Sequence, residues 1–388
     1  MAPSLYLDHN ATAPMPAPVA EAMAAAFETF GNPSSVHGPG RAARHLIDEA
    51  RETLAGLLGV DPAGILFTSG GTEANNLALR GTDRRRRLVS AVEHASVLDA
   101  AAADRVPVDS RGVIDLAALD AALGAEDGPA LVSLMLANNE TGAIQPVAEA
   151  SVLARRHGAL VHCDAVQALG RLPIDPVALG IDLMSLSAHK IGGPKGIGAL
   201  VLVRDLALDP ILRGGGQELG RRAGTENLPG IAGFAAAARL AVAALDDMPR
   251  RAALRDRLEA AASDRVPGLR IWGADAPRIA NTSCLGVPGL PGETQVMGLD
   301  LAGIAVGSGA ACSSGKTAPS HVLRAMGADA DDAASAIRVS LGAETSAADL
   351  DRFLAAWSDL CARARTGRGA AACPAAGPCA VAGSLAGG

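Results

Sequence analysis

The sequence predicts an α/β protein in which helices cover both faces of a mostly parallel sheet, followed by a smaller α+β domain. Short apolar runs alternate with helix-like segments over residues 16–250, which is typical of such a sheet. Several runs end in polar clusters, and the alternation stops near residue 250. We therefore expect a large domain over residues 16–250 and a small domain built from residues 1–15 and 251–368. Residues 369–388 have too few large side chains to fold and are expected to form a disordered tail.

Length and composition indicate a soluble globular protein with a large core. The chain has 388 residues, of which 49% are hydrophobic and 19% charged, and its net charge is -7. A negative net charge offers no general attraction for nucleic acid or anionic lipid, and the basic run at residues 84–87 is too short to change that. The apolar stretch at residues 235–245 is well short of the roughly 20 residues that span a bilayer. We expect neither a nucleic-acid partner nor a membrane partner.

The cysteines and the first residues favour the cytoplasm. The six cysteines lie at irregular positions, 163, 284, 312, 361, 373 and 379, which match neither a disulfide framework nor a CxxC metal pattern. Residues 1–4 lead directly into the strand-like residues 5–7, so no signal peptide is expected. We expect reduced thiols and no resident metal ion.

Polar clusters follow the apolar runs of the predicted sheet. They are TSGGTE at residues 68–73, NNE at residues 138–140, Asp164 after residues 160–162, and SAHK at residues 187–190. Ligands of parallel sheets bind beyond the carboxyl ends of the strands. We therefore expect these clusters to form one site.

Lys190 is the best placed of only three lysines, the others being Lys195 and Lys316. It follows an apolar strand and precedes a glycine-rich turn. A partly desolvated lysine at a strand end can lose its proton and condense with an aldehyde. A surface lysine beside a glycine loop is the alternative from these residues alone.

Two further features suit a phosphorylated, nitrogen-containing ring. The glycine turn at residues 70–71 precedes a predicted helix, whose free N–H groups and the Thr72 hydroxyl suit a phosphate. Asp164 ends an apolar strand, where a buried carboxylate needs a cation, and a protonated pyridine nitrogen would serve. The alternatives are an ordinary capped helix start and an aspartate that caps the next helix.

Three more side chains are candidates for chemistry. His94 follows the apolar run at residues 88–92, where an imidazole could stack on a ring and carry protons, although a lone histidine is more often structural. Cys312 lies in a stretch of small residues with Lys316 nearby to favour the thiolate, although it could be an incidental loop thiol. Arg338 interrupts a strand-like run with a fork suited to a carboxylate, although a structural salt bridge would explain it equally well.

Together these residues resemble, over residues 5 to about 365, the cysteine desulfurases of the NifS/IscS type. That family belongs to the class-V aminotransferases, which are fold-type-I enzymes dependent on pyridoxal 5'-phosphate (PLP). The landmarks of the resemblance are YLDHNAT (6–12), GNPSS (31–35), TSGGTE (68–73), EH (93–94), NNETG (138–142), DAVQ (164–167), SAHK (187–190), GGPKG (192–196), RAGT (222–225) and the segment around Cys312.

The resemblance implies a seven-stranded, mostly parallel sheet, a homodimer and a sulfurtransferase activity. Such an enzyme removes sulfur from L-cysteine, releases L-alanine and keeps the sulfur as a persulfide on Cys312. The persulfide would pass to a sulfur acceptor or an iron–sulfur scaffold protein, for iron–sulfur cluster assembly or other sulfur transfer. Cys312 could also serve through its persulfide as a transient iron–sulfur ligand, and no other metal ligand is implied.

The same resemblance implies a role for each site residue. Lys190 would bind PLP covalently and move the substrate α-proton, and His94 would stack on the ring and handle the thiol proton. Asp164 would pair with the pyridine nitrogen and Gln167 with the ring hydroxyl. The remaining assignments are Gly71, Thr72, Ser187 and His189 to the phosphate, Thr225 to the phosphate of the other subunit, Asn139 to the cofactor and the substrate carboxylate, and Arg338 to that carboxylate.

Some positions depart from the family pattern. Ala13 replaces a common threonine, Ala311 follows Ala310 where Ser-Ala is usual, and Ala318 replaces an acidic residue before Pro319. Two alternatives stay open. One is the same fold acting as a selenocysteine lyase or cysteine sulfinate desulfinase, which needs no essential cysteine. The other is a non-catalytic sulfur-relay or scaffold subunit, which would lack the absorbance at about 420 nm expected of bound PLP.

Overall fold

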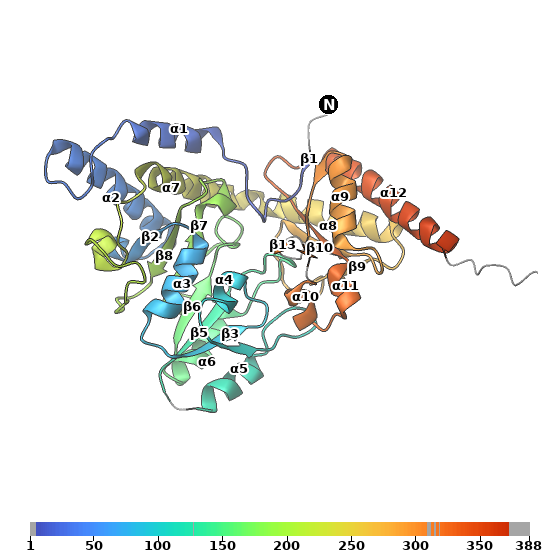
Figure 1. The fold of residues 1–388 in the computed structure, drawn as a ribbon, viewed down its shortest axis with the longest axis horizontal. Helices are drawn as coiled ribbons and strands as arrows, with labels where there is room; N and C mark the ends of the chain where they lie inside the picture. Colours follow the sequence, from blue (N-terminus) through green and yellow to red (C-terminus); the bar gives the residue numbers. More distant parts are fainter. Residues whose placement is uncertain (1–4, 127, 309–311, 314–315, 318, 372–388) are drawn as a thin grey trace, which may run out of the picture.

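A seven-stranded sheet and a four-stranded sheet organise the computed structural model, and Figure 1 shows them in different parts of the molecule. The structure describes residues 5–126, 128–308, 312–313, 316–317 and 319–371, with side chains for residues 5–126, 128–308 and 319–365. The predicted tail after residue 371 therefore lies outside the described residues, and the helix before it, α12 (Ala347–Ala371), extends slightly past the predicted boundary.

The large sheet confirms the predicted mostly parallel, seven-stranded arrangement. Only β8 runs antiparallel to its neighbours, because it pairs antiparallel with both β2 and β7 whereas the other pairs are parallel. In spatial order the strands are β2 (Ile65–Thr68), β8 (Gly198–Leu202), β7 (Leu183–Ser187), β6 (Leu160–Asp164), β5 (Ala130–Met135), β3 (Arg86–Ser90) and β4 (Asp104–Val106).

Helices cover both faces of this sheet, which explains why its strands are apolar throughout. Ile65 and Phe67 of β2 pack in one core cluster, whereas Leu66 between them packs in another with Leu77. Both sets of side chains on a strand are therefore buried, as in parallel sheets with two covered faces. The first cluster includes α2 (Gly38–Leu58), α5 (Leu116–Gly124), α6 (Val147–Arg156) and α7 (Leu228–Ala243), and the second includes α3 (Gly71–Gly81) and α4 (Ala95–Leu98).

The four-stranded sheet of the second part is antiparallel. Its strands have the order β12 (Gly307–Ser308), β15 (Ala336–Ser340), β10 (Thr282–Gly286) and β9 (Arg270–Trp272). The core of this part contains Trp357, Phe353 and Leu258, which come from α12 and α8 (Met248–Arg265). Other elements here are α9 (Gly292–Leu301), α10 (His321–Ala325), α11 (Ala330–Ala334) and the strand pair β13 (Cys312–Ser313) with β14 (Lys316–Thr317). The domain boundaries proposed from the sequence stay a prediction.

The N-terminal segment connects the two parts. β1 (Leu5–Tyr6) pairs in parallel with β11 (Ile304–Ala305), and Leu7 lies in the core of the second part. The chain then crosses to the large sheet, where the Ala13 amide donates to the His189 carbonyl at 2.9 Å, before α1 (Ala17–Phe27) begins. This crossing brings Asn10 next to the turn that carries Lys190.

One helical run is long and apolar enough to cross a membrane by length and composition alone. It covers Leu228–Arg265, that is α7, the short η4 (Ala244–Asp247) and α8, and half of its apolar window is buried in the structure. Its residues Ile231 and Phe234 belong to the core around the large sheet. This placement is that of a core helix.

Candidate active site

A cavity of about 560 Å³ opens where the carboxyl ends of β5, β6 and β7 face the second part of the molecule. Of the predicted site residues whose side chains the structure describes, all line this cavity except Thr225. The lining includes Gly71, Thr72, His94, Asn139, Asp164, Gln167, Ser187, His189, Lys190 and Arg338.

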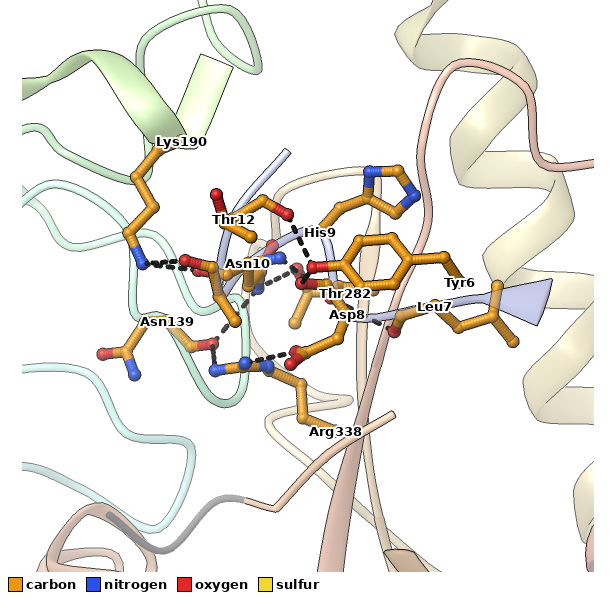
Figure 2. Close-up of polar contacts among 12 residues, drawn as sticks. Tyr6, Leu7, Asp8, His9, Asn10, Thr12, Asn139, Lys190, Thr282 and Arg338 are labelled. Carbon is orange, nitrogen blue, oxygen red and sulfur yellow. Dashed lines mark hydrogen bonds and ion pairs between the residues drawn. The ribbon is translucent and has the colours of Figure 1, made fainter. Parts of the chain in front are cut away.

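Lys190 projects from the short helix η2 (Ala188–Ile191), which follows β7 directly. Its Nζ donates hydrogen bonds to the carbonyls of Asn10, at 2.7 Å, and Ala11, at 3.0 Å (Figure 2). Burial and the nearby guanidinium groups of Arg338 and Arg171 lower the pKa of Lys190 to about 8. Near neutral pH more of this amine is neutral than in an exposed lysine, and the neutral form is the nucleophile toward an aldehyde.

Asp164 is the last residue of β6 and is only 6% exposed. Its Oδ1 accepts from the Val166 amide at 3.0 Å, and its Oδ2 accepts from Asn75 Nδ2 at 2.7 Å. Turns rather than a regular helix follow it, and Oδ1 caps the first of them through the Val166 amide, so the capping role that the sequence left open is present for one carboxylate oxygen. Within the described residues no ion pair holds this carboxylate, and it therefore suits a cationic ring nitrogen in the cavity.

Asn75, which the sequence analysis did not single out, links Asp164 to His94. Its Nδ2 also donates to Ser96 Oγ at 2.8 Å, and that hydroxyl lies 2.8 Å from His94 Nδ1. The Ser96 amide donates to the same Nδ1 at 3.1 Å, so Nδ1 is an acceptor and the proton of the neutral ring is on Nε2. Burial and the positive charge of Lys190 lower the pKa of His94, although Asp164 opposes this, and the imidazole is neutral at neutral pH.

The start of α3 has the features of a phosphate seat. Its N-cap residue, Gly70, contributes no side-chain hydrogen bond to the first N–H groups of the helix. A side chain at Gly71 would place its Cβ 2.8 Å from Val166 Cγ2, so glycine is required for this close approach. Among the described residues, His189 Nδ1 is buried without a hydrogen-bond partner. Burial and the neighbouring Lys190 lower the pKa of His189 to about 4, so its neutral ring can donate one hydrogen bond.

The side-chain amide of Gln167 is fixed in orientation. Its Oε1 accepts from Arg171 Nη1, and because arginine only donates, the amide nitrogen must lie on the other side. This Nε2 donates to the Asn10 carbonyl at 2.9 Å, beside Lys190. Gln167 therefore presents a donor to the cavity, as a ring hydroxyl or phenolate oxygen requires.

Arg338 lies at the far wall of the cavity, on β15. Its Nη2 is 2.5 Å from Asp8 Oδ1, and its Nη1 donates to the Asn139 carbonyl at 3.1 Å (Figure 2). The salt bridge that the sequence left open is thus present, but Nε is buried without a partner among the described residues. A Cβ on Gly307 would lie 2.7 Å from Asp8 Oδ1 and 3.1 Å from that Nε, so Gly307 packs directly against this edge and only glycine fits there. Arg338 also lines the cavity, where its positive charge can bind a carboxylate.

The side chain of Cys312 lies outside the described residues, but the chain on both sides of its segment reaches the cavity. Ser308 precedes the segment, and Pro319, Ser320 and His321 follow it, and all four line the cavity. The backbone of Cys312 pairs with that of Thr317 in the short β13–β14 ladder. The segment that carries the cysteine thus starts and ends at the site.

Two contacts of this region could not be anticipated from the sequence. Ser320 Oγ donates to Glu140 Oε2 at 2.6 Å, and burial raises the pKa of Glu140 to about 7. His321 Nε2 lies 2.8 Å from the Glu93 carbonyl. Glu140 belongs to the NNETG motif (138–142), but the position of this motif in the sequence does not indicate that Ser320 is its partner.

Thr225 does not reach the cavity of its own chain. It lines a separate hollow of about 90 Å³ with Ser69 and Arg222. Its assignment to the phosphate of another subunit stays a prediction.

Comparisons with known proteins agree with this geometry. Residues 5–353 match the family model of the class-V aminotransferases. A cysteine desulfurase of Cereibacter sphaeroides is 47% identical over 366 residues, which cover 90% of this chain and 94% of that protein. An IscS-like cysteine desulfurase of Mycobacterium tuberculosis is 43% identical over 95% of this chain and 98% of its own. The structure of a NifS-like protein from Rickettsia africae superposes with a TM-score of 0.85 at 34% identity, covering 92% of this chain and 99% of that one.

Proposed function

Because the chain belongs to the class-V aminotransferase family and is 43–47% identical to two cysteine desulfurases, we propose that the protein removes sulfur from L-cysteine in this cavity. The reacting groups would be Lys190, His94 and Cys312. The observation that carries this proposal is the placement of Lys190. Its amine has a lowered pKa and shares the cavity with a carboxylate, Asp164, that has no ion-pair partner among the described residues.

The residues present fit PLP. Lys190 would form the covalent link, Asp164 would face the ring nitrogen, and Gln167 would donate to the ring oxygen. The start of α3, with Ser187 and His189, would hold the phosphate. When bound, PLP supplies an electron sink that stabilises negative charge at the substrate Cα.

The side chains of this chain would divide the remaining work. Arg338 and Asn139, which both line the cavity, would orient the substrate carboxylate, which places the substrate Cα next to Lys190. The Lys190 amine would take the α-proton and return one to carbon. His94 Nε2, the ring nitrogen not held by Ser96, would handle the thiol proton of the substrate.

The sulfur transfer itself would occur at Cys312. Its thiolate forms an S–S bond with the substrate sulfur while the C–S bond breaks. The electron pair of the broken bond stays on carbon, and a proton added there gives the methyl group of alanine. The products are L-alanine and a Cys312 persulfide, which an acceptor thiol or an iron–sulfur scaffold protein would then receive.

The assembly and the location are also part of the proposal. A homodimer would let Thr225 of one subunit approach the phosphate seat of the other, since Thr225 lines a different hollow in its own chain. The irregular cysteine spacing, together with the free buried thiols of Cys163, Cys284 and Cys361, supports a reducing compartment such as the cytoplasm.

Borohydride reduction of the PLP-loaded protein, followed by peptide mapping, tests the assignment of Lys190. Reduction traps PLP on the lysine to which it is bound, and we expect the label on Lys190 alone. Lys195, which is exposed nearby on the same turn, is the internal control. Label on Lys195 or Lys316 in place of Lys190 would refute the assignment.

A further inference from the structure

Arg171 is a buried cation that has no counter-charge among the described residues. It lies in the turn after β6, is 7% exposed, and donates only to neutral oxygens. These are the carbonyl and Oε1 of Gln167, the His9 carbonyl at 3.3 Å and the Lys190 carbonyl at 3.4 Å. Within the part of the chain that the structure describes, no carboxylate pairs with its guanidinium, although the other strongly buried arginines Arg51, Arg278 and Arg338 each have one.

Such an arrangement is costly, so a purely structural role explains it poorly. Arginine stays protonated in proteins, and a buried charge is normally paired with an opposite one. Neutral donors would satisfy the same carbonyl oxygens without that cost. We therefore infer that the positive charge of Arg171 has a function of its own.

A short chain of hydrogen bonds connects this charge to the Lys190 amine. Arg171 Nη1 donates to Gln167 Oε1, and Gln167 Nε2 donates to the Asn10 carbonyl at 2.9 Å. Lys190 Nζ donates to the same carbonyl at 2.7 Å. One amide side chain and one peptide carbonyl thus separate the guanidinium from the amine.

From this geometry we propose that Arg171 is the positioning residue of the cofactor lysine. Its unpaired positive charge disfavours protonation of the Lys190 amine. Its guanidinium group also holds Gln167 Oε1, so that the amide nitrogen of Gln167 faces the site. The inference rests on the proposed function only in taking Lys190 as the lysine that binds PLP. Two positive charges close together in a water-poor site repel each other, so the neutral amine is favoured.

Other charges near Lys190 also affect the protonation of its amine. Arg338 opposes protonation, whereas Asp164 and Asp8 favour it. The imidazoles near the amine are neutral: burial is the main cause that lowers the pKa values of His94 and His189, and also of His9, which lies next to Arg171. The two arginines are therefore the cations that act on this amine from other elements of the described chain.

The test is the pH dependence with which Lys190 reacts in the full-length chain freed of PLP. Brief acetylation with acetic anhydride at a series of pH values, read by mass spectrometry of the lysine peptides, gives the titration midpoint of Lys190. The exposed Lys195 corrects for reagent decay at each pH. Circular dichroism and recovery of PLP binding check that each variant is folded.

Two variants separate charge from contact. Arg171→Gln keeps a donor but removes the charge, and it should raise the Lys190 midpoint by about one pH unit. Arg171→Lys keeps the charge but loses the fork, and its midpoint should stay within about 0.3 units of the wild type. A folded Arg171→Gln variant with the wild-type midpoint would overturn the inference. So would a wild-type midpoint at the ordinary lysine value of about 10.4.

A second measurement covers a variant that is unstable without PLP. In the loaded protein, the pH midpoint of the absorbance band at about 420 nm reports the proton on the nitrogen of Lys190. Loss of the Arg171 charge should raise this midpoint as well, and an unchanged value contradicts the inference. Borohydride label on another lysine would instead refute the proposed function and leave the acetylation result standing.

Discussion

Single amides and carbonyls hold the charged groups of this site in place. Asn75 joins the carboxylate of Asp164 to Ser96 and thereby to His94. The Asn10 carbonyl accepts from both Lys190 and Gln167. Because Asn10, Asn75 and Gln167 are buried, a charged side chain that moved would leave one of their donors or acceptors unsatisfied. The site is therefore preorganised before substrate arrives.

The role of Arg338 in binding the substrate carboxylate can be tested by a single substitution. Arg338→Lys keeps the positive charge but replaces the planar guanidinium group with a single ammonium group, so the substrate carboxylate would lose a bidentate contact. We expect KM for L-cysteine to rise roughly 10- to 100-fold, or about 1.4–2.8 kcal/mol, with a smaller change in kcat. Steady-state kinetics with the exposed Arg239→Lys as control measures this, and an unchanged KM would show that Arg338 does not bind the substrate.

Some site residues could be predicted from the sequence and others could not, because only some of them stand out from their local sequence. Lys190 and Asp164 follow or end apolar strands, where a charge is conspicuous. Asn75 lies within a helix, and Arg171 in a turn, where such residues are common. Their importance depends on contacts between segments distant in the sequence, which no local pattern records.

Among the elements, the residues that flank the segment 309–318 on both sides are held at the cavity. Ser320 caps α10 by accepting from the Leu323 amide, and its hydroxyl also donates to Glu140. Ser308, on the other side, belongs to β12, which pairs with the strand of Arg338. The two anchors hold the ends of the Cys312 segment against the part of the cavity expected to bind substrate.

Glu140 makes this anchor sensitive to pH. Its pKa is raised from 4.5 to about 7, so between these values the folded protein binds more protons than the unfolded one. The stability that Glu140 contributes is fully present below about pH 4.5 and is lost as the pH rises through about 7, to the extent of roughly 3 kcal/mol. Glu140→Gln, which stays neutral, should remove this part of the pH dependence.

Urea unfolding of the PLP-loaded protein between pH 5 and pH 8 measures the effect of Glu140. The difference in unfolding free energy between Glu140→Gln and the wild type should grow in favour of the variant as the pH rises. Glu149→Gln, at an exposed position of α6, is the matched control. A difference that does not change with pH would show that Glu140 is ionised throughout.

At the scale of the whole molecule, much of the architecture follows from the sequence pattern. Fully apolar strands between helices predicted the covered parallel sheet, because both faces of each strand had to be buried. The antiparallel direction of β8 was not predicted, because a fully apolar run of residues has the same pattern whichever way the strand runs. The path of residues 8–13 also escaped prediction, because it depends on how the two parts meet.

Exposed apolar side chains support the predicted assembly into dimers. Phe27, Phe30 and Val36, at the end of α1 and beyond it, are all exposed, as is Leu219 near Thr225. If Thr225 acts in the other subunit, mixing Lys190→Ala and Thr225→Ala chains creates heterodimers with one intact site. Random exchange should then restore activity at roughly a quarter of the wild-type sites. Activity no higher than the average of the two separate variants would contradict a shared site.

The central claim is that Cys312 takes the sulfur of L-cysteine, and the most direct test compares products in the wild type and Cys312→Ser. Alanine release is measured with L-cysteine and with L-selenocysteine, and the persulfide is located by mass spectrometry. Ser313→Ala is the control for changes in the same segment. Since a hydroxyl is a poor nucleophile toward sulfur, we expect Cys312→Ser to release alanine from cysteine at least about 100-fold more slowly while still binding PLP. Normal turnover of cysteine by Cys312→Ser would contradict the account and favour a selenocysteine lyase or sulfinate desulfinase.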